Sequence, residues 1–117
     1  MAKGVVLLLG VVLLAVGMCG ALTGGHNHDL IIFGINMTHN VVHMLSGAVA
    51  LLAATGGEKH AKTSCLLFGL VYGLVAISGL LNLAAVVDLL NLNMADNILH
   101  LTIAAVCFYA GTQSKPA

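Results

Sequence analysis

The stretch NMTHNVVHMLSG, residues 36–47, brings two histidines and two asparagines into an otherwise apolar region. A second version, NMADNILHLTIA, occupies residues 93–104 and begins 57 residues after the first. The polar residues of each stretch are three or four positions apart, so on a helix they share one face. The two stretches therefore indicate a duplicated helical unit that carries polar groups on one side.

The composition around these stretches is that of a membrane protein. The chain has 117 residues, of which 60% are hydrophobic and 7% are charged, and its net charge is zero. Soluble domains carry about 25% charged residues, so a bilayer is the solvent that this composition fits. The neutral balance gives no indication of a nucleic-acid partner. The isolated cysteines, Cys19, Cys65 and Cys107, suggest no disulfide framework.

Four apolar runs are candidates for membrane-spanning helices, since a bilayer core of about 30 Å needs about 20 apolar residues. They cover residues 4–23, 33–55, 64–87 and 94–111. The first run follows Lys3 and resembles a signal peptide, but it has the length of a span and we expect it to be retained. The prediction is an all-α, four-helix transmembrane bundle that forms a single domain over residues 1–117.

The four spans divide into two similar halves. LLLG at residues 7–10 matches LLFG at 66–69, and Gly20 matches Gly79 at the same offset of 59. In the second helix of each half, the matching residues are 57 apart. We therefore predict two parallel helical-hairpin repeats, residues 1–57 and 60–113, related by a pseudo-twofold axis along the membrane normal.

The charged residues predict the orientation of these spans. With four spans, the lysines all fall on one side of the membrane: Lys3, Lys59, Lys62 and Lys115. The acids of the other side are Asp29, Asp88 and Asp96. The positive-inside rule then places both termini in the cytoplasm. We expect the membrane to be a bacterial inner membrane, of the plasma or energy-transducing type.

Glycines and asparagines predict how the helices pack. Small residues let helix backbones approach closely within a membrane. The glycines expected at helix contacts are Gly10, Gly17, Gly20, Gly69, Gly73 and Gly79. Amides exposed to lipid would cost several kcal/mol, so we expect them to face inward in the outer half of the bundle. This expected polar core comprises Asn36, Asn40, Asn82, Asn93 and Asn97.

The histidines of the two stretches are candidates for a metal site. His39 and His43 are four residues apart, as are Asp96 and His100, so each pair lies on one helix face. Together they make a ligand set suited to zinc, iron or copper. A haem held between His43 and His100 is a second possibility, and a chlorophyll would need one histidine. No nucleophile paired with a base stands out, so we expect no enzymatic activity.

The same two stretches resemble a family of uncharacterised bacterial four-helix membrane proteins, a domain of unknown function. Its members have a pattern similar to LHNxVHLxxG in the second helix and to NxADNxLHxxxG in the fourth. Thr38 and the pair Ile103-Ala104 depart from these patterns, but the histidine and aspartate positions do not. The resemblance extends over nearly the whole chain. It implies four spans and a functional importance of the polar stretches, but no particular activity.

Two functions follow as expectations. The first is a small, non-enzymatic accessory or scaffold subunit, which would associate with itself or with a larger membrane complex through glycine-rich helix faces. The alternative is a metal- or haem-binding redox or sensor protein that uses the histidine and aspartate cluster. The bilayer is the expected environment of both.

Overall fold

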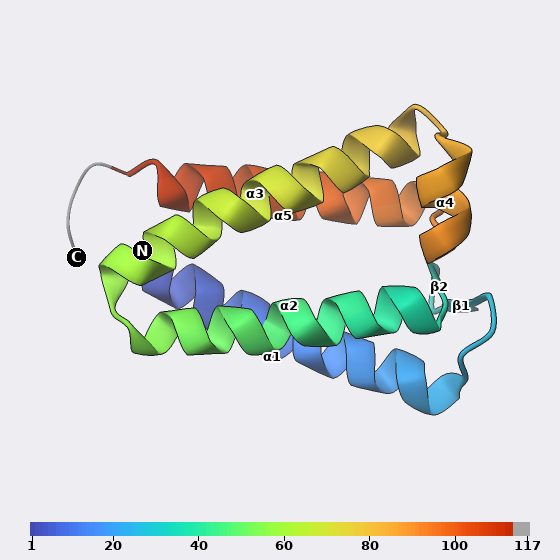
Figure 1. Cartoon of the computed structure of the whole chain (residues 1–117), viewed down its shortest axis with the longest axis horizontal. Helices are drawn as coiled ribbons and strands as arrows, with labels where there is room; N and C mark the ends of the chain where they lie inside the picture. The colour runs from blue at the N-terminus through green and yellow to red at the C-terminus, as the bar shows by residue number, and fades with distance from the viewer. Residues whose placement is uncertain (114–117) are drawn as a thin grey trace.

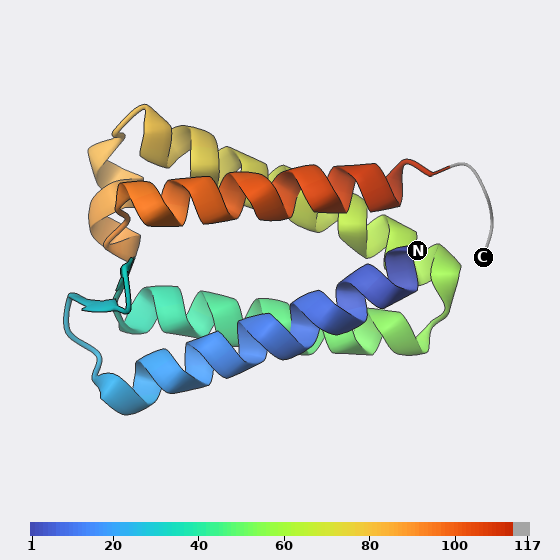
Figure 2. The same ribbon diagram turned by 180° about the vertical axis from the view of Figure 1, so that it is seen from behind.

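The computed structural model describes residues 1–113 and shows an all-α bundle within them (Figure 1). Its elements are α1 (Ala2–Thr23), β1 (His28–Leu30), β2 (Phe33–Ile35), α2 (Met37–Thr55), α3 (Glu58–Leu80), α4 (Ala84–Leu90) and α5 (Met94–Gly111). The four long helices are each long and apolar enough to cross a membrane. The β-hairpin and α4 lie together at the end of the bundle opposite the N-terminus (Figures 1 and 2).

Two predicted helix boundaries are wrong. The third helix covers Glu58–Leu80 instead of residues 64–87, because Asn82 takes a left-handed conformation with φ 55° and turns the chain into α4. The second helix begins at Met37 instead of residue 33, because residues 33–35 form a strand that pairs with β1. Both segments are apolar, so hydropathy alone extended the helices through them.

The polar stretches begin helices α2 and α5 through matching N-caps. The Asn36 side chain accepts a hydrogen bond from the His39 backbone N–H at 3.0 Å. The Asn93 side chain accepts one from the Asp96 N–H at 3.0 Å, and Asp96 Oδ2 accepts one from the Asn93 N–H at 3.0 Å. This second arrangement is a capping box, which satisfies two N–H groups that the helix leaves free. The first residues of each stretch thus set where its helix starts.

The two hairpins bury matching positions, at the same offsets of 59 and 57 residues that relate the similar stretches of the sequence. The buried residues of α1 recur in α3, each 59 positions later: Ala2, Val6, Gly10, Leu13, Gly17 and Gly20, then Ala61, Cys65, Gly69, Tyr72, Ala76 and Gly79. Those of α2 recur in α5, each 57 positions later: His39, Asn40, His43, Gly47, Ala50 and Ala54, then Asp96, Asn97, His100, Ala104, Cys107 and Gly111. Every buried position of α1 and α2 therefore has a buried counterpart in α3 and α5.

Glycines bring the two helices of each hairpin into close contact. A Cβ atom on Gly20 would overlap the Asn40 side chain, and one on Gly79 would overlap the Asn97 side chain. Gly10 and Gly17 of α1 likewise lie against α2, and Gly69 lies against Phe108 of α5. Gly73 differs, since its Cβ would lie 3.6 Å from the Cβ of Ala104, which is ordinary contact. Apart from the half-buried Gly73, these glycines are buried between helices of the same chain.

The two hairpins also exchange equivalent hydrogen bonds at the end that carries the β-hairpin. Asn36 Nδ2 donates to the carbonyl of Leu89 at 3.0 Å, and Asn93 Nδ2 donates to that of Ile32 at 2.9 Å. Because Leu89 lies 57 residues after Ile32, the two bonds are reciprocal, as in an interface between identical subunits. Asn91, at φ 53°, adds a bond to the Ile35 carbonyl at 3.0 Å.

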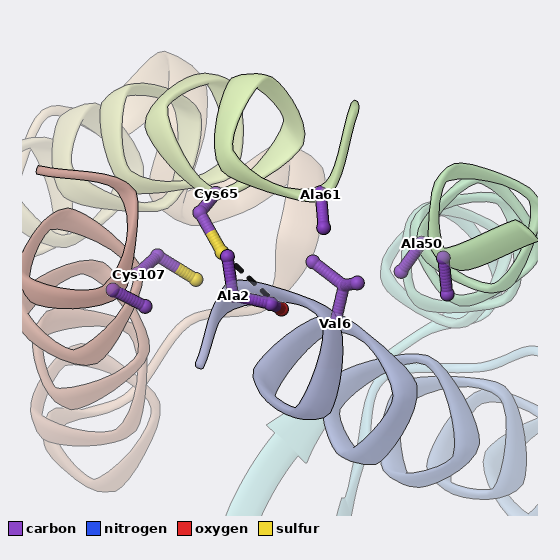
Figure 3. Close-up of a cluster of buried hydrophobic side chains, with 8 residues drawn as sticks. Ala2, Val6, Ala50, Ala61, Cys65 and Cys107 are labelled. Carbon is purple, nitrogen blue, oxygen red and sulfur yellow. Dashed lines mark hydrogen bonds between the residues drawn. The ribbon is translucent and has the colours of Figure 1, made fainter. Parts of the chain in front are cut away.

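At the opposite end, a cluster of small buried side chains joins the hairpins (Figure 3). Ala2 and Val6 of α1 meet Ala61 and Cys65 of α3 there. Glu58 accepts hydrogen bonds from the backbone N–H groups of Ala2 at 2.6 Å and of Lys3 at 3.0 Å. A carboxylate at the start of a helix is favoured by the helix dipole. The bundle is therefore closed at both ends by contacts between its halves.

Candidate metal centre

Three imidazoles gather between the hairpins, two from α2 and one from α5. His39, His43 and His100 are exposed by 1%, 3% and 1%, respectively. The ring centroid of His43 lies 4.4 Å from that of His39 and 5.9 Å from that of His100. One ring nitrogen from each histidine lies within 4.8 Å of the others. Two helices that belong to different halves thus bring their imidazoles to one point.

A backbone carbonyl orients one of these rings. His39 Nδ1 lies 2.9 Å from the Leu90 carbonyl oxygen at the end of α4. Since a carbonyl only accepts hydrogen bonds, Nδ1 carries the proton and Nε2 keeps its lone pair. Histidines that bind metals in proteins are held in this way, with one nitrogen on the ion and the other donating to a carbonyl or carboxylate.

The remaining ring nitrogens have no hydrogen-bond partner. In the part of the chain that the structure describes, this holds for Nε2 of His39 and for both nitrogens of His43 and His100. Leaving a buried polar group unpaired costs about 1–3 kcal/mol, and native interiors seldom do so. The five unpaired nitrogens in one cluster therefore mark these imidazoles as candidate metal ligands.

Asp96, which the sequence analysis joined to the imidazoles, lies outside this group. Its carboxylate belongs to the capping box, where Oδ2 accepts the Asn93 N–H. Asp96 is the counterpart of His39 in the repeat, and both occupy the third position of their helices. The aspartate side chain is shorter than histidine and folds back onto the helix start, so the ligand set contains three histidines.

The predicted asparagines divide into three groups. Asn40 and Asn97 are buried beside the glycines of the neighbouring helix, and the Asn40 amide has no partner among residues 1–113. Asn36 and Asn93 are half-buried caps. Asn82 is exposed in the turn after α3 and does not belong to the polar core.

Two residues near the cluster were missed by sequence reasoning. Tyr72 of α3 packs on His100, with ring centroids 5.5 Å apart. Its place in the helical pattern gave it no special weight, since a tyrosine in an apolar span is common. Asn91 ties α4 to the β-hairpin, and the tolerance of asparagine for left-handed conformations was the available signal.

The ring geometry admits a small ion and not a haem. Nitrogens that bind one tetrahedral ion at about 2.0–2.1 Å lie about 3.3 Å apart, so the three rings must draw together by up to about 1.5 Å. His39 stands 4.4 Å from His43 and 5.5 Å from His100, centroid to centroid. This third ring occupies the space in which a porphyrin between His43 and His100 would lie. Neutral imidazoles suit zinc, copper, iron or nickel.

Comparison with known proteins supplies a family and no activity. The family model described as Domain of unknown function (DUF4383) matches residues 3–113. No curated protein and no solved structure matches the chain.

Proposed function

The chain belongs to the DUF4383 family, a domain of unknown function, and from its own residues we propose that it is a membrane-embedded metal-binding protein with His39, His43 and His100 as ligands. The match over residues 3–113 confirms the expected membership of a family described as a domain of unknown function. The observation that carries the proposal is the cluster of five buried, unpartnered imidazole nitrogens.

A purely structural role explains these groups less well. Polar residues that specify helix packing do so by pairing with one another, because an unpaired group in a dry interior is costly. The caps of α2 and α5 follow this rule, since their side chains make hydrogen bonds. The imidazole cluster does not, and neither does the Asn40 amide, but only the three rings lie close enough together for one metal ion to satisfy a nitrogen of each.

The ligand set favours an ion of low charge. Three neutral imidazoles do not compensate the charge of a bound ion, and charge is expensive in an apolar interior. Cu⁺ therefore fits this site better than Zn²⁺ does, and imidazole is a good ligand for both. Three protein ligands leave a coordination position open, as in sites that exchange a ligand. The proposed role is redox or sensing, without an enzymatic reaction.

Metal analysis of the purified protein tests this proposal. After chelation and reloading with Cu⁺ or Zn²⁺, we expect one ion per chain, because the three rings form one site. His39→Gln, His43→Gln and His100→Gln should each weaken binding by about 100-fold or more, since even second-shell changes cost 10- to 100-fold. His60→Gln is the matched control, because His60 is exposed and its Nδ1 bonds the Gly56 carbonyl in the turn between α2 and α3, outside the histidine cluster.

Folding of each variant is checked by its elution as a single species in size-exclusion chromatography. Failure of the folded wild-type protein to retain any ion would overturn the proposal. So would equal binding by wild type and all three variants.

We further propose that the end of the bundle with the N-terminus faces the cytoplasm of a bacterial inner membrane. Lys3 and the pair Lys59 and Lys62 lie near the starts of α1 and α3, whereas Asp29 and Asp88 lie in β1 and α4 at the other end (Figure 1). Lys115 lies outside the described residues. Lysines concentrate on the cytoplasmic side of bacterial membrane proteins. The imidazoles would then occupy the outer half of the membrane.

Reporter fusions in a bacterial host test this orientation. Green fluorescent protein fused after the last residue should fluoresce, and alkaline phosphatase fused there should be inactive, because both report a cytoplasmic end. Phosphatase fused after residue 29 follows one span and should be active. An active phosphatase at the C-terminus would reverse the assignment.

The accessory-subunit role loses the surface on which it was based. Gly10, Gly17, Gly20, Gly69 and Gly79 are buried between helices of the same chain. They therefore cannot serve as an open helix face for a partner. Association with itself or with another membrane protein would need a different surface, such as the apolar side chains exposed along the helices.

A further inference from the structure

Two grooves run along the seams between the hairpins, and the repeat relates one to the other. The α1–α5 groove has a volume of about 250 Å³, and the α2–α3 groove has one of about 330 Å³. Leu8 and Val12 line the first, and their counterparts 59 positions later, Leu67 and Val71, line the second. Figure 2 shows the side with α1 and α5 in front, and Figure 1 shows α2 and α3.

The two seams differ where they meet the imidazole cluster. Position 13 of α1 is leucine, and its counterpart in α3 is Tyr72, whose ring packs on His100. Within the described chain, the lining of the α2–α3 groove does not include His100. In the α1–α5 groove, which has Leu13 in its lining, His43 is itself a lining residue. The tyrosine thus covers one histidine, and the smaller leucine leaves the other in contact with the groove.

The lining of the groove is mostly apolar, and its polar residues are His43 and Thr102, whose hydroxyl donates to the Ile98 carbonyl of its own helix. The His43 side chain is 3% exposed, and neither ring nitrogen has a partner in residues 1–113. In the proposed metal centre, one nitrogen binds the ion through its lone pair. The other then carries the proton of the neutral ring and is a hydrogen-bond donor without an acceptor. The missing acceptor is the kind of group that a ligand in the groove would supply.

We propose that the α1–α5 groove binds an isoprenoid quinone from the bilayer, with a ring carbonyl accepting a hydrogen bond from His43. This inference rests on the proposed metal centre, because the ion determines that the free nitrogen is the donor. The isoprenoid chain lies along the aliphatic side chains of α1 and α5, among them Leu9, Val16 and Ile103.

Other lipid-phase molecules match the groove less well. A plain acyl chain would fill it and leave His43 unsatisfied, which costs free energy in a dry site. A fatty acid would bring a carboxylate into an apolar groove, and an unpaired buried charge is costly. A sterol hydroxyl can accept a hydrogen bond but also brings a donor, for which the lining offers only the hydroxyl oxygen of Thr102. A quinone carbonyl is neutral and only accepts.

The test measures binding of a single-isoprene ubiquinone, isotope-labelled at its ring carbonyls, to the full chain in phosphatidylcholine vesicles. Hydrogen bonding to the imidazole should shift one carbonyl resonance in solid-state NMR relative to protein-free vesicles. Leu13→Tyr, which copies Tyr72 into the first seam, should abolish the shift, because the new ring covers His43. Tyr72→Leu should create a second binding site, since it uncovers His100.

Metal content is measured on the same samples, so that the two proposals can be separated. The expected result is a metal-loaded Leu13→Tyr protein that lacks the quinone shift. Val71→Leu in the other groove is the control and should bind like wild type. A wild-type protein that holds the ion without a carbonyl shift overturns the quinone site alone. An unchanged shift in Leu13→Tyr, or displacement of the quinone by an equimolar sterol, also overturns it. Loss of the ion from wild type overturns the metal centre instead.

Discussion

Gly79→Ala is expected to lower the free energy of unfolding by about 3 kcal/mol, at the upper end of what overpacking costs. The new methyl group would overlap the side chain of Asn97, which is buried between α3 and α5 and has little room to turn away. Either the two helices separate or the amide leaves its rotamer. Gly20→Ala should have a similar effect, because Gly20 lies on Asn40 in the same way.

Gly73→Ala is the matched control for this prediction. It places the same methyl group on α3, but 3.6 Å from the Ala104 Cβ, where it makes an ordinary contact. Alanine also favours the helix over glycine by about 0.8–1.0 kcal/mol, so this variant should be as stable as wild type or more stable. Chemical unfolding in detergent measures all three. Equal stabilities for Gly79→Ala and Gly73→Ala would show that the helices are not in close contact at Gly79.

A bound ion is expected to stabilise the fold by an amount set by its concentration. At a free ion concentration 100 times the Kd, the free energy of unfolding should rise by about 2.7 kcal/mol, provided that the ion binds only the folded chain. His100→Gln should remove this gain, because it breaks the connection that the ion makes between α2 and α5. Thermal unfolding at increasing Cu⁺ or Zn²⁺ concentration measures the effect.

His60→Gln serves again as the control and should keep the full gain. His100→Gln without metal is compared with wild type without metal, which separates the loss of the ion from any change in packing. If the ion raises the melting temperature of His100→Gln as much as that of wild type, the three-histidine assignment is wrong.

Much of the fold could be predicted because the bilayer imposes it. Apolar runs of span length, such as residues 4–23, have few alternatives to a membrane helix, and the structure places α1 at Ala2–Thr23. The end of the third helix could not be predicted in this way. Leu81 and Leu83 are as apolar as the helix before them, and only the left-handed conformation of Asn82 between them turns the chain. Asparagine adopts that conformation in some contexts and remains helical in others.

The histidines of the candidate site could be predicted from the sequence, but the exclusion of Asp96 and the contact with Tyr72 could not. Spacing along one helix showed that His39 and His43 share a face, because that relation is local. Whether Asp96 faces His100 or the start of its own helix depends on competing hydrogen bonds, and the capping box takes its carboxylate. The contact of Tyr72 with His100 joins α3 to α5. The sequence shows that Leu13 and Tyr72 differ at matching positions, but not that the tyrosine ring reaches the histidine.

The reciprocal bonds of Asn36 and Asn93 bear on what a chain of two similar hairpins can build. Consider two separate, identical hairpins related by the same twofold axis. Every side chain away from that axis would then occur twice. Joining the copies in one polypeptide removes that restriction, since each half can then change alone. Histidine at position 39 and aspartate at position 96 are such a divergence. A single chain can therefore bring three imidazoles to one site, whereas a symmetric pair of hairpins could bring only an even number.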